Sequence, residues 1–148
     1  MKRIRRILHA SDFSGPSRLA FARAIDFAKL ARAEVILVHV LNPIVPYVGD
    51  GYVAPQLYDQ IVTDLQTRAR KQLQQMAARA KAAGVRAGVL LLEGVPPERI
   101  VRAARAKRAG LIVMGTHGHT GLTRMILGSV AGRVVATAPC PVLTVRGR

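Results

Sequence analysis

The 148-residue chain lacks tryptophan, has a single cysteine, and carries only 8 acidic residues against 23 lysines and arginines. One cysteine, Cys140, excludes an internal disulfide and fits a reducing compartment. It lies between two prolines with no second cysteine nearby, so we expect a small buried residue rather than a nucleophile or metal ligand. No apolar run approaches the roughly 18 residues of a membrane span. The basic amino terminus is followed by too short an apolar run for a secretory signal, and we expect a cytoplasmic protein without membrane association.

Basic residues dominate the charge, and the formal net charge is +15. Such a charge would attract polyanions at low salt. The cations are spread along the chain, and the three tyrosines and three phenylalanines do not interleave with them. The stacking surface of a single-strand nucleic-acid binder is therefore missing. We expect solvated basic helix faces, with nucleic-acid binding that is non-specific and confined to low salt.

Apolar patterning predicts alternating strands and helices. Strands are predicted at residues 4–10, 34–41, 85–92, 110–114 and 141–145. Helices are predicted at residues 17–31, 56–83, 129–136 and from residue 96, and a long loop at 42–55. The helix at 17–31 has a broad apolar side that includes Leu19 and Leu30. The helix at 56–83 has one apolar stripe, formed by Leu57, Ile61, Leu65, Ala69, Leu73, Met76 and Ala80.

This alternation, without repeats or linkers, indicates one domain over residues 1–148. The predicted fold class is α/β, with a doubly wound, five-stranded parallel sheet and helices on both faces. We expect the Rossmann-like strand order 3-2-1-4-5. In such sheets ligands bind beyond the carboxyl ends of the strands, where the strand order reverses.

The most informative segment is GTHGHTGLTRMILGS, residues 115–129, which sets Gly-x-x-Gly, nine residues and Gly-Ser directly behind a predicted strand. It is typical of a phosphate-binding loop, because glycines allow positive φ and close approach of backbone amides to an anion. Gly128 and Ser129 open a helix whose free amides favour negative charge, and Ser129 can cap them or donate to a phosphate. The alternative is a glycine-rich connection without a ligand. Within the spacer, His119 and Arg124 are expected to face solvent.

Asp12 follows the first predicted strand and would meet the glycine loop at the switch point. An acidic residue there can accept hydrogen bonds from a ribose or a base edge. The alternative is a helix cap or Asx turn, and both roles can hold together.

These residues give the chain its resemblance to the universal stress proteins, in particular to their ATP-binding branch. Gly115-x-x-Gly118-x9-Gly128-Ser129 matches the family's nucleotide signature, joined by Asp12-Phe13-Ser14, His39-Val40 and Gly94-Val95-Pro96. The resemblance runs over residues 3–145. It implies a ribose contact at Asp12, an adenine contact through the backbone of Val40, a triphosphate cradle, and a pocket lined by Ala10 and Met114, where members often carry proline at the position of Ala10. The implied cradle consists of Gly115, Gly118, Gly128, Ser129 and Val130.

The resemblance implies an ATP-binding regulatory or stress-response protein, with Mg²⁺ arriving on the nucleotide phosphates, since no histidine pair or carboxylate cluster has metal-ligand spacing. A homodimer through the strand at 141–145 is also expected, because an apolar sheet edge is normally paired. The chain has no Walker motif, no His-x-Gly-His and no Ser-Gly-Gly-x-Asp-Ser. We therefore expect no enzymatic role, with slow ATP hydrolysis left open. The alternatives are an ATP-hydrolysing enzyme of the same architecture and a charge-driven polyanion binder.

Overall fold

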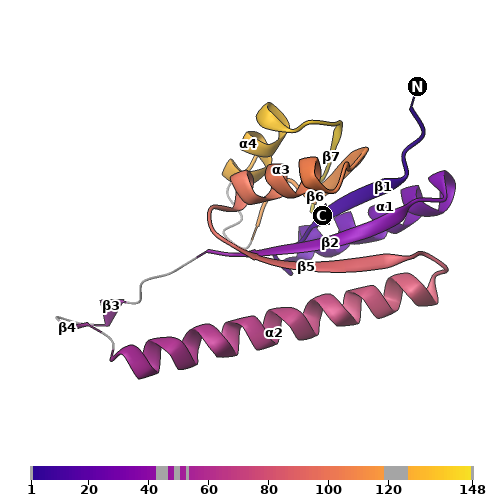
Figure 1. The fold of residues 1–148 in the computed structure, drawn as a ribbon. Helices are drawn as coiled ribbons and strands as arrows, with labels where there is room; N and C mark the ends of the chain where they lie inside the picture. The colour runs from indigo at the N-terminus through magenta and orange to yellow at the C-terminus, as the bar shows by residue number, and fades with distance from the viewer. Residues whose placement is uncertain (1, 43–46, 49–50, 53, 119–126, 148) are drawn as a thin grey trace.

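The computed structural model describes residues 2–42, 47–48, 51–52, 54–118 and 127–147. Strands and helices alternate along the chain (Figure 1). In chain order they are β1 (Arg6–Ala10), α1 (Gly15–Ala31), β2 (Glu34–Leu41), β3 (Tyr47–Val48), β4 (Gly51–Tyr52), α2 (Pro55–Ala82), β5 (Ala87–Glu93), α3 (Pro96–Ala106), β6 (Leu111–Gly115), α4 (Ser129–Thr137) and β7 (Val142–Val145). No helix in these ranges is long and apolar enough to cross a membrane.

Five of the strands form one parallel sheet in the order β5-β2-β1-β6-β7. This confirms the predicted order 3-2-1-4-5 and the α/β fold class. The prediction of a plain loop at 42–55 missed one feature, because β3 and β4 pair there as a two-stranded antiparallel sheet. The buried run from Val35 to Val38 in β2 is explained by its position inside the sheet, where helices cover both faces.

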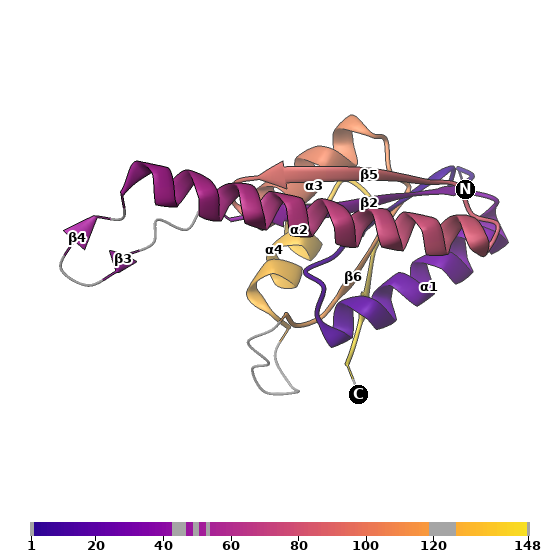
Figure 2. The same ribbon diagram turned by 90° about the horizontal axis from the view of Figure 1, so that it is seen from below.

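Helices cover the two faces of the sheet in pairs, as Figures 1 and 2 show. One core lies beneath α1 and α2 and includes Ile7 of β1, Ala24 of α1 and Leu73 of α2. The other lies beneath α3 and α4 and includes Leu8 of β1 and Ile100 of α3. Because successive side chains of a strand point to opposite faces, β1 contributes to both cores.

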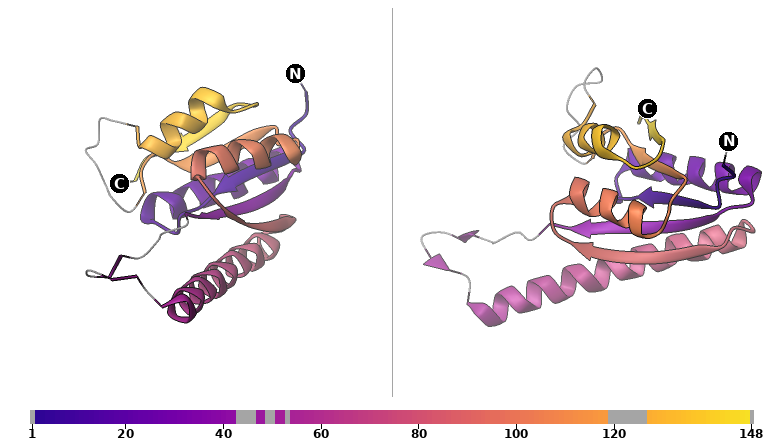
Figure 3. Two further views of the ribbon diagram at one scale, coloured as in Figure 1. Left: turned by 60° about the vertical axis from the view of Figure 1, so that its left-hand side comes forward. Right: turned by 45° about the horizontal axis from the view of Figure 1, so that its top comes forward.

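The first half of α2 extends beyond the sheet (Figure 3). With 28 residues, α2 is roughly 42 Å long, whereas the eight residues of β2 span roughly 26 Å. The predicted apolar stripe is therefore buried only in its second half, for example at Leu73, and Leu57, Ile61 and Leu65 are 50%, 37% and 44% exposed. The apolar side predicted for α1 is correct only in part, because Ile25 and Ala28 are buried whereas Leu19 and Leu30 are 38% and 83% exposed.

His9 in the central strand β1 is completely buried. Its Nδ1 donates a hydrogen bond to the carbonyl oxygen of Val113 at 2.9 Å, and its ring lies 5.7 Å from that of Phe21. Its Nε2 has no partner in the described part of the chain. Desolvation lowers the pKa of His9 to about 4, although the Val113 carbonyl and the charge of Asp12 act in the opposite direction. The imidazole is thus neutral in the folded protein at neutral pH.

Candidate functional site

A pocket of about 550 Å³ lies at the carboxyl ends of β2, β1 and β6, on the face covered by α3 and α4. This volume falls in the range typical of small-molecule sites. Its floor is a row across three strands, because Ala10 is in register with Val38 on one side and Met114 on the other. The small side chain of Ala10 leaves space between its larger neighbours. Pro96 and Ile100 at the start of α3 form one wall.

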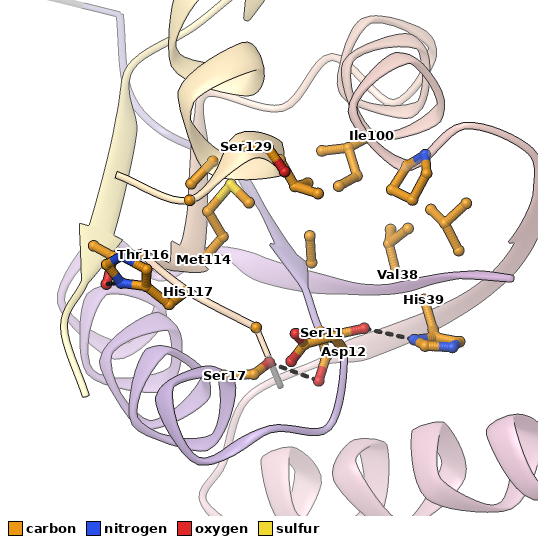
Figure 4. A pocket seen from close by; sticks show the side chains of 18 of the residues that line it. Ser11, Asp12, Ser17, Val38, His39, Ile100, Met114, Thr116, His117 and Ser129 are labelled. Atoms are coloured by element: carbon orange, nitrogen blue, oxygen red, sulfur yellow. Dashed lines mark hydrogen bonds between the residues drawn. The ribbon is translucent and has the colours of Figure 1, made fainter. Parts of the chain in front are cut away.

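The start of α4 forms the opposite wall of the pocket, where Figure 4 shows Ser129 across from Ser11 and Asp12. The amides of the first helical residues, Ser129, Val130 and Ala131, have no partner within a helix, and no side chain of the described residues caps this end. The helix dipole adds partial positive charge at the same place. This wall therefore suits an anion.

The glycines of the loop make close backbone contacts. A Cβ on Gly115 would lie 3.2 Å from the backbone of Pro16 and Ser17, one on Gly118 would lie 2.5 Å from Oδ2 of Asp12, and one on Gly128 would lie 2.6 Å from the carbonyl oxygen of Thr116. The amide of Gly128 donates to that same carbonyl oxygen at 2.8 Å. Any side chain at these positions would displace the loop or the Asp12 carboxylate.

Asp12 lies in a short connection between β1 and α1 whose polar groups are bonded to one another. Its Oδ1 accepts a hydrogen bond from the amide of Ser14 at 2.9 Å, which is an Asx turn. Ser14 itself is the N-cap of α1 and accepts from the amide of Ser17 at 3.3 Å. The hydroxyl of Ser17 donates to Ser11 Oγ at 2.8 Å. The Asx turn that the sequence analysis gave as the alternative role of Asp12 is thus present. The second carboxylate oxygen, Oδ2, lies close to Gly118.

Phe13 and His39 hold this connection against the end of β2. Phe13 has φ of 64°, in the left-handed region that an aromatic residue rarely adopts. Its ring stacks on that of His39 with centroids 4.4 Å apart, and Nδ1 of His39 donates to the carbonyl oxygen of Ser11 at 2.6 Å. The amide of Phe13 donates to Ser11 Oγ at 3.1 Å. These contacts offset the backbone strain and fix the position of Asp12.

The structure brings all nine of the site residues named from the sequence to the lining of this one pocket. They are Ala10, Asp12, Val40, Met114, Gly115, Gly118, Gly128, Ser129 and Val130. Sequence reasoning did not include the serines at 11 and 17, Thr116 or the wall from α3. The serines gave a signal, since Ser11, Ser14 and Ser17 cluster around Asp12 in the sequence.

Some expectations need correction. Among the glycines that the structure describes, only Gly84 and Gly94 have positive φ, so Gly115, Gly118 and Gly128 provide close approach and not an unusual turn. Ser129 is not the cap of α4, because Gly128 occupies the N-cap position and Ser129 is the first helical residue. Cys140 is only partly buried, and burial raises the pKa of its thiol.

The remaining expectations concern the nine residues between Gly118 and Gly128 and the binding of a metal ion. His119 and Arg124 lie outside the described residues. His117, within them, places its Nδ1 2.9 Å from Thr116 Oγ1. Within the described ranges no group of three or more histidine, cysteine, aspartate or glutamate residues is arranged to hold a metal ion. Asp12 is the sole carboxylate among the described lining residues of the pocket, and no lysine or arginine occurs among them.

Comparison with known proteins places this fold and site in context. The model of the Universal stress protein family matches residues 3–146. Universal stress protein MJ0531 of Methanocaldococcus jannaschii is 40% identical over 142 residues, covering 96% of this chain and 82% of that protein. The structure of the hypothetical protein MJ0577, from the same organism, aligns with a TM-score of 0.84 at 25% identity and covers 99% of both chains. A universal stress protein from Archaeoglobus fulgidus in complex with dAMP aligns with a TM-score of 0.66 at 25% identity, over 98% of this chain and 99% of that one.

Proposed function

The chain belongs to the universal stress protein family, and from this membership and the pocket described above we propose that it is an ATP-binding regulatory protein of the stress response. The observation that carries the proposal is the start of α4, where Gly128 occupies the N-cap position and the first helical amides face the same pocket as Asp12 and the glycine loop. The dAMP complex of the Archaeoglobus fulgidus relative supports a nucleotide as the ligand. We also propose a cytoplasmic location and a homodimer paired through β7, which lies at the edge of the sheet.

In this proposal each part of the pocket binds one part of the nucleotide. The apolar floor of Ala10 and Met114 receives the nucleoside, and the backbone of Val40 binds the adenine edge. The Asp12 carboxylate accepts hydrogen bonds from the ribose hydroxyls. Such bonds to a charged acceptor are stronger than those between neutral groups.

The phosphates would lie against the glycine loop and the start of α4. The amides of Ser129 and Val130 and the Ser129 hydroxyl supply donors, and Gly115, Gly118 and Gly128 leave room for the phosphates to approach the backbone. A Mg²⁺ ion would enter with the phosphates, since that ion is commonly held by phosphate oxygens with one or two carboxylates and water. Asp12 is the one carboxylate in the described lining, and in this proposal it binds the ribose, so the phosphates and water would hold the ion.

We propose storage or sensing of ATP rather than its rapid hydrolysis. Phosphoryl transfer is accelerated by cations that stabilise the transition-state charge and by a group that orients the attacking water. The described lining of the pocket contains no lysine or arginine, and Asp12 is committed to the ribose and to the Ser14 amide. The donors at the start of α4 bind the ground state and the transition state alike, which favours binding without turnover.

The test begins with mass spectrometry of small molecules released when freshly purified protein is denatured, followed by calorimetry on nucleotide-free protein. We expect ATP to be released and to rebind with a 1:1 stoichiometry. Asp12→Ala should weaken binding by about 1.5–3 kcal/mol, roughly 10- to 150-fold, as for a lost hydrogen bond to a charged group.

The matched control is Asp26→Ala, which removes the same charge from an exposed position on α1, where Asp26 pairs with Arg23. This variant should bind ATP as the wild type does. Equal weakening by both variants would show that ATP responds to net charge alone. A turnover of several ATP molecules per second would exclude the storage or sensing role.

A further inference from the structure

The edge of the sheet opposite the pocket gathers basic residues from separate parts of the sequence. Four neighbouring strands, in the order β5-β2-β1-β6, begin at this edge. The residues that lead into them are 83–86 before β5, 32–33 before β2, 2–5 before β1 and 107–110 before β6. These connections contain seven exposed cations, which we call the basic edge, and they are Lys2, Arg3, Arg5, Arg32, Arg86, Lys107 and Arg108.

Backbone hydrogen bonds hold these connections side by side. The amide of Glu34 donates to the carbonyl of Arg5, that of Val35 to the carbonyl of Arg86, and that of Gly110 to the carbonyl of Arg6. Figure 1 shows the chain's amino terminus and the connection from α2 to β5 at the same end of the sheet. Lys29, Arg32 and Arg86 also line a common depression of about 320 Å³. The seven cations of the basic edge thus lie on one surface, in addition to the basic residues on the helices.

Almost no acid neutralises this surface. The four connections contain no aspartate or glutamate. Glu34, the first residue of β2, lies at this edge, and it pairs with Arg6 at 2.5 Å. Asp12, Asp59, Asp64, Glu93 and Glu98 lie on other parts of the molecule: at the carboxyl end of the sheet, on the first half of α2 and at the start of α3. Asp26, in the second half of α1, pairs with Arg23. The seven exposed cations of the basic edge thus share this edge with one acid, Glu34, which already pairs with Arg6.

Two arginines of the basic edge, Arg32 and Arg108, have an unusual backbone conformation. Arg32 has φ of 53° and Arg108 has φ of 52°, both in the left-handed region just after a helix. Glycine or asparagine is the usual residue there, because other side chains are strained. The equivalent connection after α2 does carry glycine, Gly84 with φ of 81°. The helix dipole favours a cation near the carboxyl end of a helix, but this effect does not require the arginine to occupy the strained position itself.

We propose that the basic edge binds the phosphate backbone of duplex nucleic acid without reading its sequence. The connections contain no aromatic residue on which single-stranded bases could stack. Five of the seven cations are arginines, whose guanidinium groups bind phosphate in a bidentate manner. Four strands about 4.8 Å apart give a surface roughly 15 Å wide, and that length of duplex carries about eight phosphates. The nucleotide pocket lies at the other end of the strands, so both ligands can be bound together.

The test is fluorescence anisotropy of a labelled 20-base-pair DNA duplex of random sequence, at 50 to 300 mM KCl, without nucleotide. Five to seven neutralised phosphates should give a plot of log K against log salt with a slope of about −4.5 to −6.3. The edge variant combines Arg32→Gly, Arg86→Gln and Arg108→Gly. Because it removes three cations, it should make the slope less steep by about 2.7. If the two proteins bind equally at about 1 M salt, this change in slope weakens the binding of the variant roughly 500-fold at 0.1 M salt.

The matched control variant combines Arg68→Gln, Arg70→Gln and Lys71→Gln, three exposed positions on α2. It changes the net charge by the same three units and should alter the slope by less than about 1. Glycine is favoured at the left-handed positions of Arg32 and Arg108, so the edge variant should melt no lower than the wild type. Loss of DNA binding in a protein of unchanged stability would then be due to the lost cations.

Three outcomes would overturn the proposal. Equal losses of DNA affinity in the edge and control variants would mean that binding depends on the net charge of the protein and not on the position of the cations. Salt-insensitive binding to one DNA sequence would mean that another surface of the protein contacts the base edges. Binding of the wild type to phosphatidylserine vesicles at 150 mM salt, lost in the edge variant and with no binding to DNA, would identify an anionic membrane as the partner. Asp12→Ala should leave DNA affinity unchanged, so this test and that of ATP binding can fail independently.

Discussion

Replacing the buried His9 should remove a specific part of the pH dependence of stability. The pKa of this imidazole is lowered to about 4 in the folded protein, from its ordinary value of 6.5. Between these two pH values the unfolded chain binds a proton that the folded chain does not, so the free energy of unfolding falls as the pH falls. The full contribution is present above about pH 6.5 and is lost by about pH 4.

The size of the effect follows from the same two values. A difference of about 2.5 pKa units corresponds to roughly 3 kcal/mol, of which about 2 kcal/mol should be lost between pH 7 and pH 5. This is a large share of the 5–15 kcal/mol by which a typical domain is stable. Burial causes the shift, because the ring lies in the core between β1 and α1, where Nε2 has no partner in the described part of the chain.

The assay is urea denaturation of the wild type and of His9→Leu at pH 7, 6, 5 and 4.5. Other titrating groups are common to both proteins, so the difference between their free energies of unfolding isolates His9. We expect this difference to shift by about 2 kcal/mol in favour of the variant between pH 7 and pH 5. His9→Met should give the same curve, because the effect belongs to the imidazole and not to side-chain shape. A difference that is constant with pH would refute the reasoning.

Two further variants test the loop and the sheet edge. Gly118→Ala places a Cβ 2.5 Å from Oδ2 of Asp12 and should weaken ATP binding measurably by calorimetry. Gly132→Ala should not, because the nearest neighbour of its Cβ among the described residues is Leu127 at 3.9 Å. The loss should shrink when Asp12 is already alanine, and full additivity of the two changes would contradict the contact. At β7, Leu143→Arg should convert a homodimer to monomers in solution scattering, while the exposed control Leu30→Arg should leave the dimer intact. A monomeric wild type at micromolar concentration would disprove the dimer.

The strand order and the pocket could be predicted because each depends on local sequence signals. The bounds of β2 agree with its apolar run, which starts at Glu34 and ends at Leu41. Asp12 follows β1 and Gly115 ends β6, and these two strands are neighbours in the sheet, so the switch-point rule correctly predicted that they lie together. The family resemblance then supplied the pocket-lining residues at Ala10, Val40 and Met114.

Other features depend on tertiary contacts that no local pattern contains. Hydrophobic periodicity showed that one side of α2 is apolar, but not that the sheet ends before it covers Leu57 and Ile61. The left-handed backbone of Phe13 depends on stacking with His39, which is distant in the sequence. The role of Gly118 became clear only when its approach to Asp12 was known. The basic edge likewise arises from topology, since Arg32, Arg86 and Arg108 are far apart in the chain.

The central claim, that ATP binds in the pocket at the carboxyl ends of β1 and β6, is tested most directly by mapping ATP onto the backbone with amide NMR. Nucleotide-free, ¹⁵N-labelled protein would be titrated with ATP and Mg²⁺ at 150 mM salt. We expect the largest shifts at Gly115, Gly128, Ser129 and Val130, around the start of α4 and the loop that precedes it. Shifts confined instead to the basic edge, at Arg32, Arg86 and Arg108, would show that the phosphates respond only to surface charge, and would contradict the account.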